Sequence, residues 1–561
     1  MRMKKTHGDC SRPSPLSSPS IVRDSSAGRR GRSTLGLALT RRPNLALLLV
    51  LGMFYVPWAA SIPLDGTLEG NRLEAAREML QSGDWLVPTL GGTVYLAKPP
   101  LHPWTLALLA RPLGDVSVAG GRAVSIAAAI ATCYVVARWG RRELGRRTGT
   151  AAAFALGTAF VFAEKGLRAE LESELTLFST LALLALWDAT RRRERSVALS
   201  VVSGLALAAA VLVKGPPPLI VYLAAACALC TATNERRAVL AAAGTAVALS
   251  LLCALAWVVP VCVRVGLASA WSSMHEQFFE RIVNAGRTNV EPFWFYGPAL
   301  LLAFLPATLL LPVVALVRPL RGNGASRERA RFLWGWALLP LVLFSVSDGK
   351  ETRYLLPTLP AWSLLLAWGW TRARTSCRFV GWRTGLARGL RAVSWIAPVA
   401  WAVIGWLRYP EARIVVTASA ACALAGRAAF DWSERSQRPT AALLAVLIVL
   451  GAGKVAWAGT ALARQRSASP LGDVGSALAA RLAPDEPWIL VGPYRSWLHF
   501  AVNRPCVDVQ SVEYLEEARR RCSARYLFAR EDSIPAGTRG LEREERWSID
   551  GEPYGLYRVD P

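Results

Sequence analysis

The sequence predicts an all-α polytopic membrane protein that carries a small α/β domain at its C-terminal end. Of its 561 residues, 53% are hydrophobic and 22 are Trp, which is more apolar surface than one soluble core needs. From about residue 44 to residue 458, apolar stretches alternate with short charged loops, as in proteins with repeated transmembrane helices. After residue 460 the chain carries 15 Asp+Glu and 14 Arg, which indicates a soluble segment.

The apolar stretches define thirteen predicted spans. Several are shorter than the roughly 20 residues that a helix needs to cross a bilayer, so their ends are loose by a few positions. The spans cover approximately residues 44–63, 119–137, 148–163, 175–188, 197–213, 217–233, 238–263, 296–317, 333–346, 354–371, 393–407, 413–430 and 440–458.

The distribution of charge predicts the orientation of these spans. With a cytoplasmic N-terminus, the segments on the inside hold 34 Lys+Arg and 9 Asp+Glu, whereas the rest of the chain holds 31 of each. Because Lys and Arg are retained on the cytoplasmic side, this split favours a cytoplasmic N-terminus and an outer C-terminus. The formal net charge of +25 is therefore explained by the basic residues of the cytoplasmic segments, and we expect no nucleic-acid partner.

Composition divides the chain into three parts. Residues 1–42 are rich in Ser, Pro and Arg and are predicted to be a disordered basic cytoplasmic tail. Residues 43–460 form the membrane domain, and residues 461–561 a soluble α/β domain on the outer face, with strand-like runs at 488–491 and 525–528 and a helix at 514–522. The sequence does not decide whether Cys506 and Cys522 form a disulfide. An outer compartment permits one, but two Cys in a sequence fix no geometry.

The placement of Lys points to a functional surface. Only seven residues are Lys, and four of them fall at predicted outer ends of spans, namely Lys98, Lys165, Lys214 and Lys350. A compact ammonium group suits a phosphate held at the membrane surface. The alternative is that these side chains only extend to the interface.

The first long outer loop, residues 64–118, carries a second signal. Its apolar residues recur at helical spacing, namely Leu73, Ala76, Met79 and Leu80. We therefore expect a short amphipathic helix along the membrane surface, with Glu69 and Arg72 near its N-terminal end. Pro99 and Pro100 stop helix and hold Lys98 in extended backbone. The alternative is a structural loop with solvated charges.

Several blocks of this sequence follow one another in a characteristic order: Glu69–Arg72, Arg77–Leu80, Ser82–Trp85, Lys98–Pro100, Arg168–Leu175, Thr180–Leu183, Lys214–Pro216, Pro292–Tyr296 and Arg353–Pro357. Together they resemble bacterial aminoarabinose transferases and the related protein mannosyltransferase-like family. These are glycosyltransferases of the GT-C fold that use polyprenyl-phosphate sugars. The resemblance covers roughly residues 45 to 370, and several blocks in one order are more specific than any single block.

The resemblance implies a GT-C fold with about 13 transmembrane helices in the bacterial inner membrane and a periplasmic C-terminal domain. It implies transfer of aminoarabinose, mannose or another pentose or hexose from a polyprenyl-phosphate donor, with inversion. The acceptor would be lipid A, another glycolipid or a protein. The implied partners are membrane lipid, the donor and the acceptor, and we expect no cofactor and no metal. The alternatives are a transporter or flippase, and a degenerate relative without activity.

The resemblance also assigns the acids. Glu69 occupies the position of the Asp in the family's Asp-Glu pair and is the implied base, whereas Gly70 replaces the Glu and Leu73 replaces the family's usual Tyr. A second family acid corresponds best to Glu172. Two neighbouring glutamates, Glu170 and Glu174, would exchange with it if the alignment slipped.

Five cations are candidates for binding the donor phosphate, because cations there stabilise the charge that builds on a departing phosphate. They are Arg72, Lys98, Lys214, Lys350 and Arg353. Tyr354 is a sixth candidate, because the block around it resembles the family. Two further candidates, His275 and Arg281, lie in a later outer loop. A lone His beside a span is more often a packing residue than a catalytic one.

Overall fold

A computed structural model of the chain describes residues 43–59, 66–191, 196–275, 291–435 and 471–559, with short gaps inside the last two ranges. Contacts divide the chain into two compact units, residues 1–46 and 47–561. Of the first unit only residues 43–46, the beginning of helix α2, are described. The predicted tail and the thirteenth predicted span, residues 440–458, lie outside the described residues.

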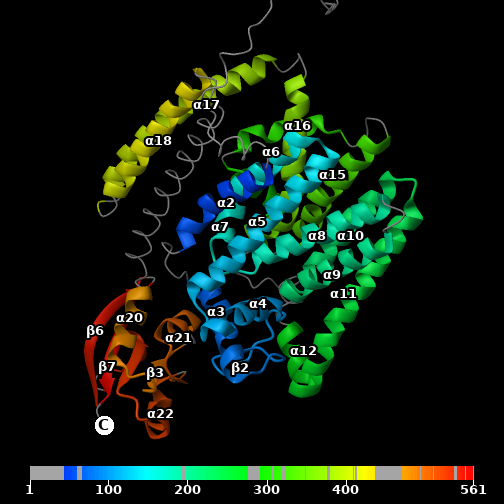
Figure 1. Ribbon diagram of the computed structural model, residues 1–561. Coiled ribbons are helices and arrows are strands. Elements are labelled where there is room, and N and C mark those ends of the chain that lie inside the picture. The colour runs from blue at the N-terminus through cyan, green and yellow to red at the C-terminus, as the bar shows by residue number, and fades with distance from the viewer. Residues whose placement is uncertain are drawn as a thin grey trace, which may run out of the picture. The chain divides into compact units, whose positions relative to one another are not determined.

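The other twelve predicted spans all coincide with helices (Figure 1). These helices are α2 (Pro43–Ala59), α5 (Val118–Glu143), α6 (Arg146–Thr158) followed by α7 (Phe160–Gly166), α8 (Glu172–Arg191), α9 (Ser196–Lys214), α10 (Pro217–Ala232), α11 (Arg236–Val265), α14 (Tyr296–Ala303) followed by η4 (Ala307–Leu316), α15 (Gly324–Ser345), η5 (Thr352–Thr358) followed by α16 (Leu359–Thr375), α17 (Val380–Arg408) and α18 (Arg413–Arg435).

Length and hydropathy single out fewer membrane-crossing helices than the sequence predicts. Within the described ranges, α5, α9 and α11 are each long and apolar enough to cross a bilayer. Three shorter apolar helical segments are Leu47–Val56, Pro217–Ala232 and Ser394–Leu407. The count of thirteen spans therefore stays a prediction, because the remaining helices are too short or too polar to be assigned by this criterion.

The helical core is held by close backbone approach and by large aromatic residues. A Cβ on Gly149 of α6 would lie 2.2 Å from the backbone nitrogen of Arg141, so α5 and α6 can approach this closely only because glycine stands there. Trp187 on α8 packs edge-on against Trp139 on α5, with ring centroids 5.8 Å apart. Helix α8 also packs against α9, and this fixes the position of its first turn, which carries two of the candidate acids.

The outer loop folds into α3 (Gly66–Ser82), the hairpin β1 (Thr89–Leu90) and β2 (Thr93–Val94), α4 (Leu101–Ala110) and the 3-10 turn η1 (Arg111–Leu113). Helix α3 includes the predicted helix, and its apolar residues Leu73, Ala76 and Met79 pack against α4. Its charged residues Glu69 and Arg72 are buried as well. The helix is therefore enclosed by protein on several sides, and not only on its apolar face as the amphipathic pattern predicts.

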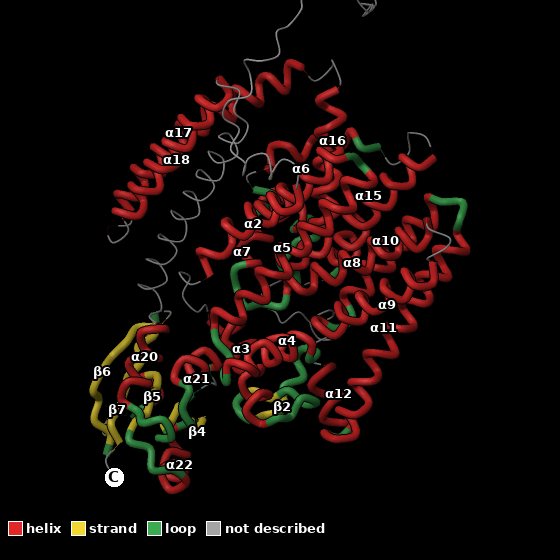
Figure 2. Tube along the Cα trace, in the orientation of Figure 1, coloured by secondary structure: helices red, strands yellow, loops and turns green. Residues whose placement is uncertain are grey.

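The C-terminal part forms a mixed sheet of order β4-β3-β5-β7-β6 (Figure 2). Strands β3 (Trp488–Val491), β4 (Cys506–Val509) and β5 (Tyr526–Arg530) are parallel, and β6 (Leu541–Ile549) and β7 (Glu552–Val559) are antiparallel. Helices α20 (Leu471–Arg481), α21 (Ser496–Val502) and α22 (Leu515–Arg521) accompany it. Alternate residues of β3 enter two separate apolar clusters, as expected for a strand that is buried on both faces. Cys506 and Cys522 are free thiols.

Helix α21 packs directly on α3. Arg77 of α3 donates a hydrogen bond to the main-chain oxygen of Phe500 at 2.8 Å, and its guanidinium lies 4.0 Å from the centre of the Phe500 ring. A Cβ on Gly70 would lie 2.8 Å from the backbone nitrogen and Cα of Trp497. The space beside the position at which the resembling family has its second carboxylate is therefore filled by the backbone of α21.

Candidate functional site

A small pocket forms where α3, the segment before α4 and the loop before α8 meet. Arg72 and Lys98 supply positive charge to its lining, and Arg72 Nη1 donates a hydrogen bond to the Tyr95 hydroxyl at 2.9 Å. Two cations and a hydroxyl in one pocket suit an anion such as a phosphate. The lining residues are Arg72, Ala75, Pro88, Tyr95, Lys98, Pro99, His102, Pro103 and Leu171.

Local structure explains why Tyr95 and Lys98 reach this pocket. Glu78 of α3 accepts hydrogen bonds from the backbone N–H groups of Gly91 at 2.5 Å and Gly92 at 3.2 Å, so the hairpin is tied to α3. Pro99 and Pro100 follow Lys98 and are buried, and α4 begins at Leu101. The segment that bears Lys98 is thus held at both ends, by the hairpin and by α4. It contains a bend at Ala97 and Lys98, and the extended backbone that the two prolines predict there stays a prediction.

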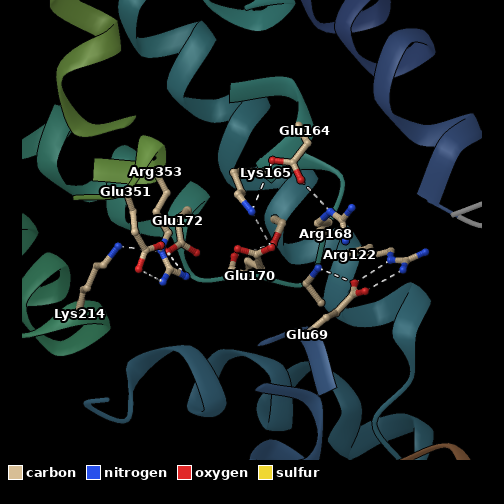
Figure 3. A network of polar contacts seen from close by, with 12 residues as sticks. Glu69, Arg122, Glu164, Lys165, Arg168, Glu170, Glu172, Lys214, Glu351 and Arg353 are labelled. Atoms are coloured by element: carbon tan, nitrogen blue, oxygen red, sulfur yellow. Dashed lines mark hydrogen bonds and ion pairs between the residues drawn. The ribbon is translucent and has the colours of Figure 1, made fainter. Parts of the chain in front are cut away.

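Glu69, the base that the resemblance implies, is held in a buried ion pair (Figure 3). Its two oxygens accept hydrogen bonds from Nε and Nη2 of Arg122 on α5, each at 2.8 Å. One of them also accepts from the backbone N–H of Ala169 at 2.8 Å. Both side chains of the pair are only 1% exposed. In this structure Glu69 fastens α3 to α5 and to the loop before α8, while Arg72, one helical turn further along, lines the pocket with Lys98.

Residues 164–172 place three carboxylates against cations (Figure 3). Glu164 pairs with Arg168 at 2.8 Å, and Glu170 pairs with Lys165 at 3.0 Å. Glu172 accepts a hydrogen bond from Lys214 at 3.1 Å. Glu174 contacts His102 on α4. The three glutamates that the alignment could not separate, Glu170, Glu172 and Glu174, therefore have three different surroundings.

The electrostatics distinguish Glu170 from Glu172. Burial alone would raise the pKa of Glu172, but Lys214 and Arg353 outweigh it and lower that pKa below its usual range. Burial and the neighbouring Glu172 charge raise the pKa of Glu170, and Lys165 only partly offsets them. The expectation that neighbouring acids raise one another's pKa thus applies to Glu170, whereas Glu172 behaves as a permanently ionised partner of two cations.

The structure brings some of the predicted phosphate ligands together. Lys214 and Arg353 meet at Glu172, with Arg353 Nη1 3.9 Å from the carboxylate, and the Lys214 ammonium lies 5.3 Å from the centre of the Tyr354 ring. Lys350 instead donates a hydrogen bond to the main-chain oxygen of Glu291 at 2.6 Å.

The two remaining candidates lie in the later outer loop. His275 is the last residue of α12 (Leu267–His275), but its side chain lies outside the described structure, and so does Arg281 as a whole.

His102 is a site residue that sequence reasoning missed. It follows Lys98-Pro99-Pro100 by two positions, lines the pocket and is 1% exposed. Its Nδ1 contacts Oε2 of Glu174, which is also buried. The sequence offered one signal, a His just behind the loop that bears Lys98, but its carboxylate partner is 72 positions away and no spacing rule connects the two.

Among the residues that the structure describes, one group has the composition of a metal site, and it lies on α21 and β4. His499, Cys506 and Asp508 bring their ligand atoms within 4.8 Å of one another. This is part of a polar cluster in which His499 Nε2 contacts Asp508 Oδ1 at 2.9 Å. The expectation that the site chemistry needs no metal stays a prediction.

Parts of this chain match the sequences of known glycosyltransferases. The family described as dolichyl-phosphate-mannose-protein mannosyltransferase matches residues 97–263. The undecaprenyl phosphate-alpha-4-amino-4-deoxy-L-arabinose arabinosyl transferase of Edwardsiella ictaluri is 31% identical over 341 residues, 58% of each chain. The protein of that description from Pseudomonas aeruginosa is 31% identical over 337 residues, 58% of this chain and 60% of its own. This chain therefore spans about 60% of these curated relatives.

Solved structures share the fold. The crystal structure of ArnT from Cupriavidus metallidurans bound to undecaprenyl phosphate aligns with a TM-score of 0.73 over 93% of this chain and 98% of that one, at 20% sequence identity. The apo structure of that protein aligns with a TM-score of 0.74 at 21% identity. The chain thus has the GT-C fold that the resemblance seen in the sequence implies. Over the aligned part of the chain it is similar to arabinosyl transferases, in agreement with that resemblance.

Proposed function

We propose that this chain is an integral membrane glycosyltransferase that moves a sugar from a polyprenyl-phosphate donor to an acceptor on the outer face of the inner membrane. The observation that carries the proposal is the pocket in which Arg72 and Lys98 meet beside Tyr95. It is supported by the relatives, which are named arabinosyl transferases, and by the shared fold of an ArnT that binds undecaprenyl phosphate.

The chemistry requires three things of the protein. It must hold the lipid phosphate, place the acceptor hydroxyl behind the anomeric carbon and remove that hydroxyl's proton. Arg72 and Lys98 would hold the phosphate and stabilise the second negative charge that develops on it as the bond to the sugar breaks. A single displacement of this kind inverts the anomeric centre.

The donor sugar would be aminoarabinose, mannose or a related pentose or hexose, and the acceptor lipid A, another glycolipid or a protein. The second cationic group, Lys214 and Arg353 around Glu172, is neutralised in part by that carboxylate. None of these side chains lines the pocket, but Glu172 follows Leu171, which does. We assign the group to holding this part of the chain in place and, through Tyr354, to contacting the lipid headgroup. The topology that fits this function has a cytoplasmic N-terminus and a periplasmic C-terminal domain, as the charge distribution predicts.

A transfer assay in nanodiscs tests the proposal. The purified protein is given labelled undecaprenyl-phosphate aminoarabinose with lipid A as acceptor, and undecaprenyl-phosphate mannose in a parallel arm. Lys98→Ala and Arg72→Ala should each lower kcat by about 10²–10³-fold, as removal of an oxyanion ligand does in other enzymes. Arg111→Ala, an exposed Arg of the same outer loop, is the matched control and should leave transfer unchanged.

Two other outcomes would favour the alternatives. Facilitated movement of the labelled lipid across the bilayer without transfer would favour a flippase. Binding of undecaprenyl phosphate with neither transfer nor lipid movement, for every donor supplied, would favour a degenerate relative whose missing second carboxylate at Gly70 has removed activity.

A further inference from the structure

His102 carries a feature that the proposed transfer does not yet use. Its imidazole is enclosed in the pocket wall, and its Nε2 has no hydrogen-bond partner among the described residues. A buried polar atom left without a partner costs about 1–3 kcal/mol. Such an atom in a folded protein calls for an explanation, and one explanation is that a ligand supplies the partner.

The other ring nitrogen determines what Nε2 can do. Nδ1 contacts the Glu174 carboxylate, which lies in the first turn of α8 and is 3% exposed. A carboxylate at Nδ1 holds the proton on that nitrogen, so the neutral ring keeps a lone pair on Nε2. The contact also fixes the ring orientation, because α8 is anchored by its packing on α5 and α9. The pair thus has the arrangement of a general base with its orienting carboxylate.

The surroundings of the imidazole fit this chemistry. Arg72 and Lys98 line the same pocket. The imidazole that would accept the proton therefore lies beside the two cations that would bind the phosphate. Glu69, by contrast, has both oxygens engaged by Arg122 and Ala169. A hydroxyl that approached this carboxylate would have to displace one of these donors, and that would leave part of the buried guanidinium unpaired.

We propose that His102 is the proton acceptor for the attacking hydroxyl and that Glu174 is its positioning residue. This inference rests on the proposed transfer and deepens it. The acceptor oxygen forms a bond to the anomeric carbon while the bond from that carbon to the phosphate oxygen breaks, and its electron pair leaves with the phosphate. The hydroxyl proton moves to His102 Nε2. The resulting imidazolium is stabilised by Glu174 and by the polyprenyl phosphate dianion, which can then take the proton and leave as the monoanion.

The test separates the two nitrogens. His102→Asn keeps an amide N–H at the place of Nδ1, where it can still bond Glu174, and removes Nε2. We expect kcat for transfer to fall by about 10²–10⁴-fold, the usual contribution of a general base. Binding of undecaprenyl phosphate and the thermal unfolding midpoint should change little. Glu174→Gln should lower kcat by a smaller factor, also with unchanged lipid binding. Leu108→Asn puts the same amide on an exposed position of α4 and should transfer normally.

Each result bears on the inference. Transfer by His102→Asn within about threefold of the unmodified protein would overturn it while the proposed function stands. A tenfold or greater loss of undecaprenyl phosphate binding with kcat retained would also overturn it, since His102 would then be a phosphate ligand. If the unmodified protein transfers no sugar from any donor, the proposed function itself fails and the inference falls with it.

Discussion

The buried pair of Glu69 and Arg122 gives the sharpest prediction, because its two interpretations differ in what a single substitution does. Glu69→Gln keeps the shape of the side chain and removes its charge. The two hydrogen bonds of 2.8 Å from Arg122 and the bond from Ala169 then compete for one amide oxygen. Breaking one side of a buried ion pair costs about 3–5 kcal/mol.

We therefore expect Glu69→Gln to lower the free energy of unfolding, measured in bicelles, by that amount. The double variant Glu69→Gln with Arg122→Met removes the unpaired guanidinium as well and should recover most of the loss, so the two substitutions should be strongly non-additive. Transfer is measured on the same samples. A double variant that folds and transfers would show that Glu69 is structural, whereas one that folds without transfer would support its assignment as the base. A Glu69→Gln variant of unchanged stability would refute this reasoning.

Three further predictions follow from the fold. Burial, opposed by Arg77 and supported by Glu78, raises the pKa of Glu74 to about 7. Because the folded protein then holds a proton that the unfolded chain has lost, its stability should fall as pH rises from about 4.5 to 7. Glu74→Gln should raise the unfolding free energy by roughly 2–3 kcal/mol at pH 8 but not at pH 4. Gly70→Ala should destabilise the protein by about 1–3 kcal/mol through its overlap with Trp497, seen as faster proteolysis of the C-terminal domain, whereas Gly52→Ala, which meets open space, should not. Treatment with EDTA should leave transfer unchanged, and a loss restored by Zn²⁺ would contradict the expectation of a metal-free site.

The sequence predicted the helices well, because hydrophobic periodicity is a local property. Strand β3 occupies residues 488–491, where the apolar run predicts it, and α3 contains the helix expected from the spacing of Leu73, Ala76 and Met79. The spacing of apolar residues could not predict the burial of α3, because that burial depends on α21, which lies more than 400 residues further along the chain.

The site was predicted only in part, because local sequence patterns do not show which residues far along the chain come into contact. Arg72 and Lys98 belong to short motifs and meet in one pocket, but Arg122 and His102 acquire their roles only from partners 53 and 72 positions away. Glu172 could not be distinguished from its neighbours by spacing, because their differences arise from the cations that other helices bring to them.

The loop before α8 and the first turn of α8 form a junction through which distant elements are connected. The loop bonds α3 through Ala169 and α7 through Glu170, the first turn bonds α9 through Glu172 and α4 through Glu174, and Leu171 between them lines the pocket. A molecule that fills the pocket and steadies this loop would tighten four elements at once. By reciprocity, anything that loosens the docking of α3 should weaken lipid binding by the same free energy, so occupancy and heat resistance of this protein should rise together.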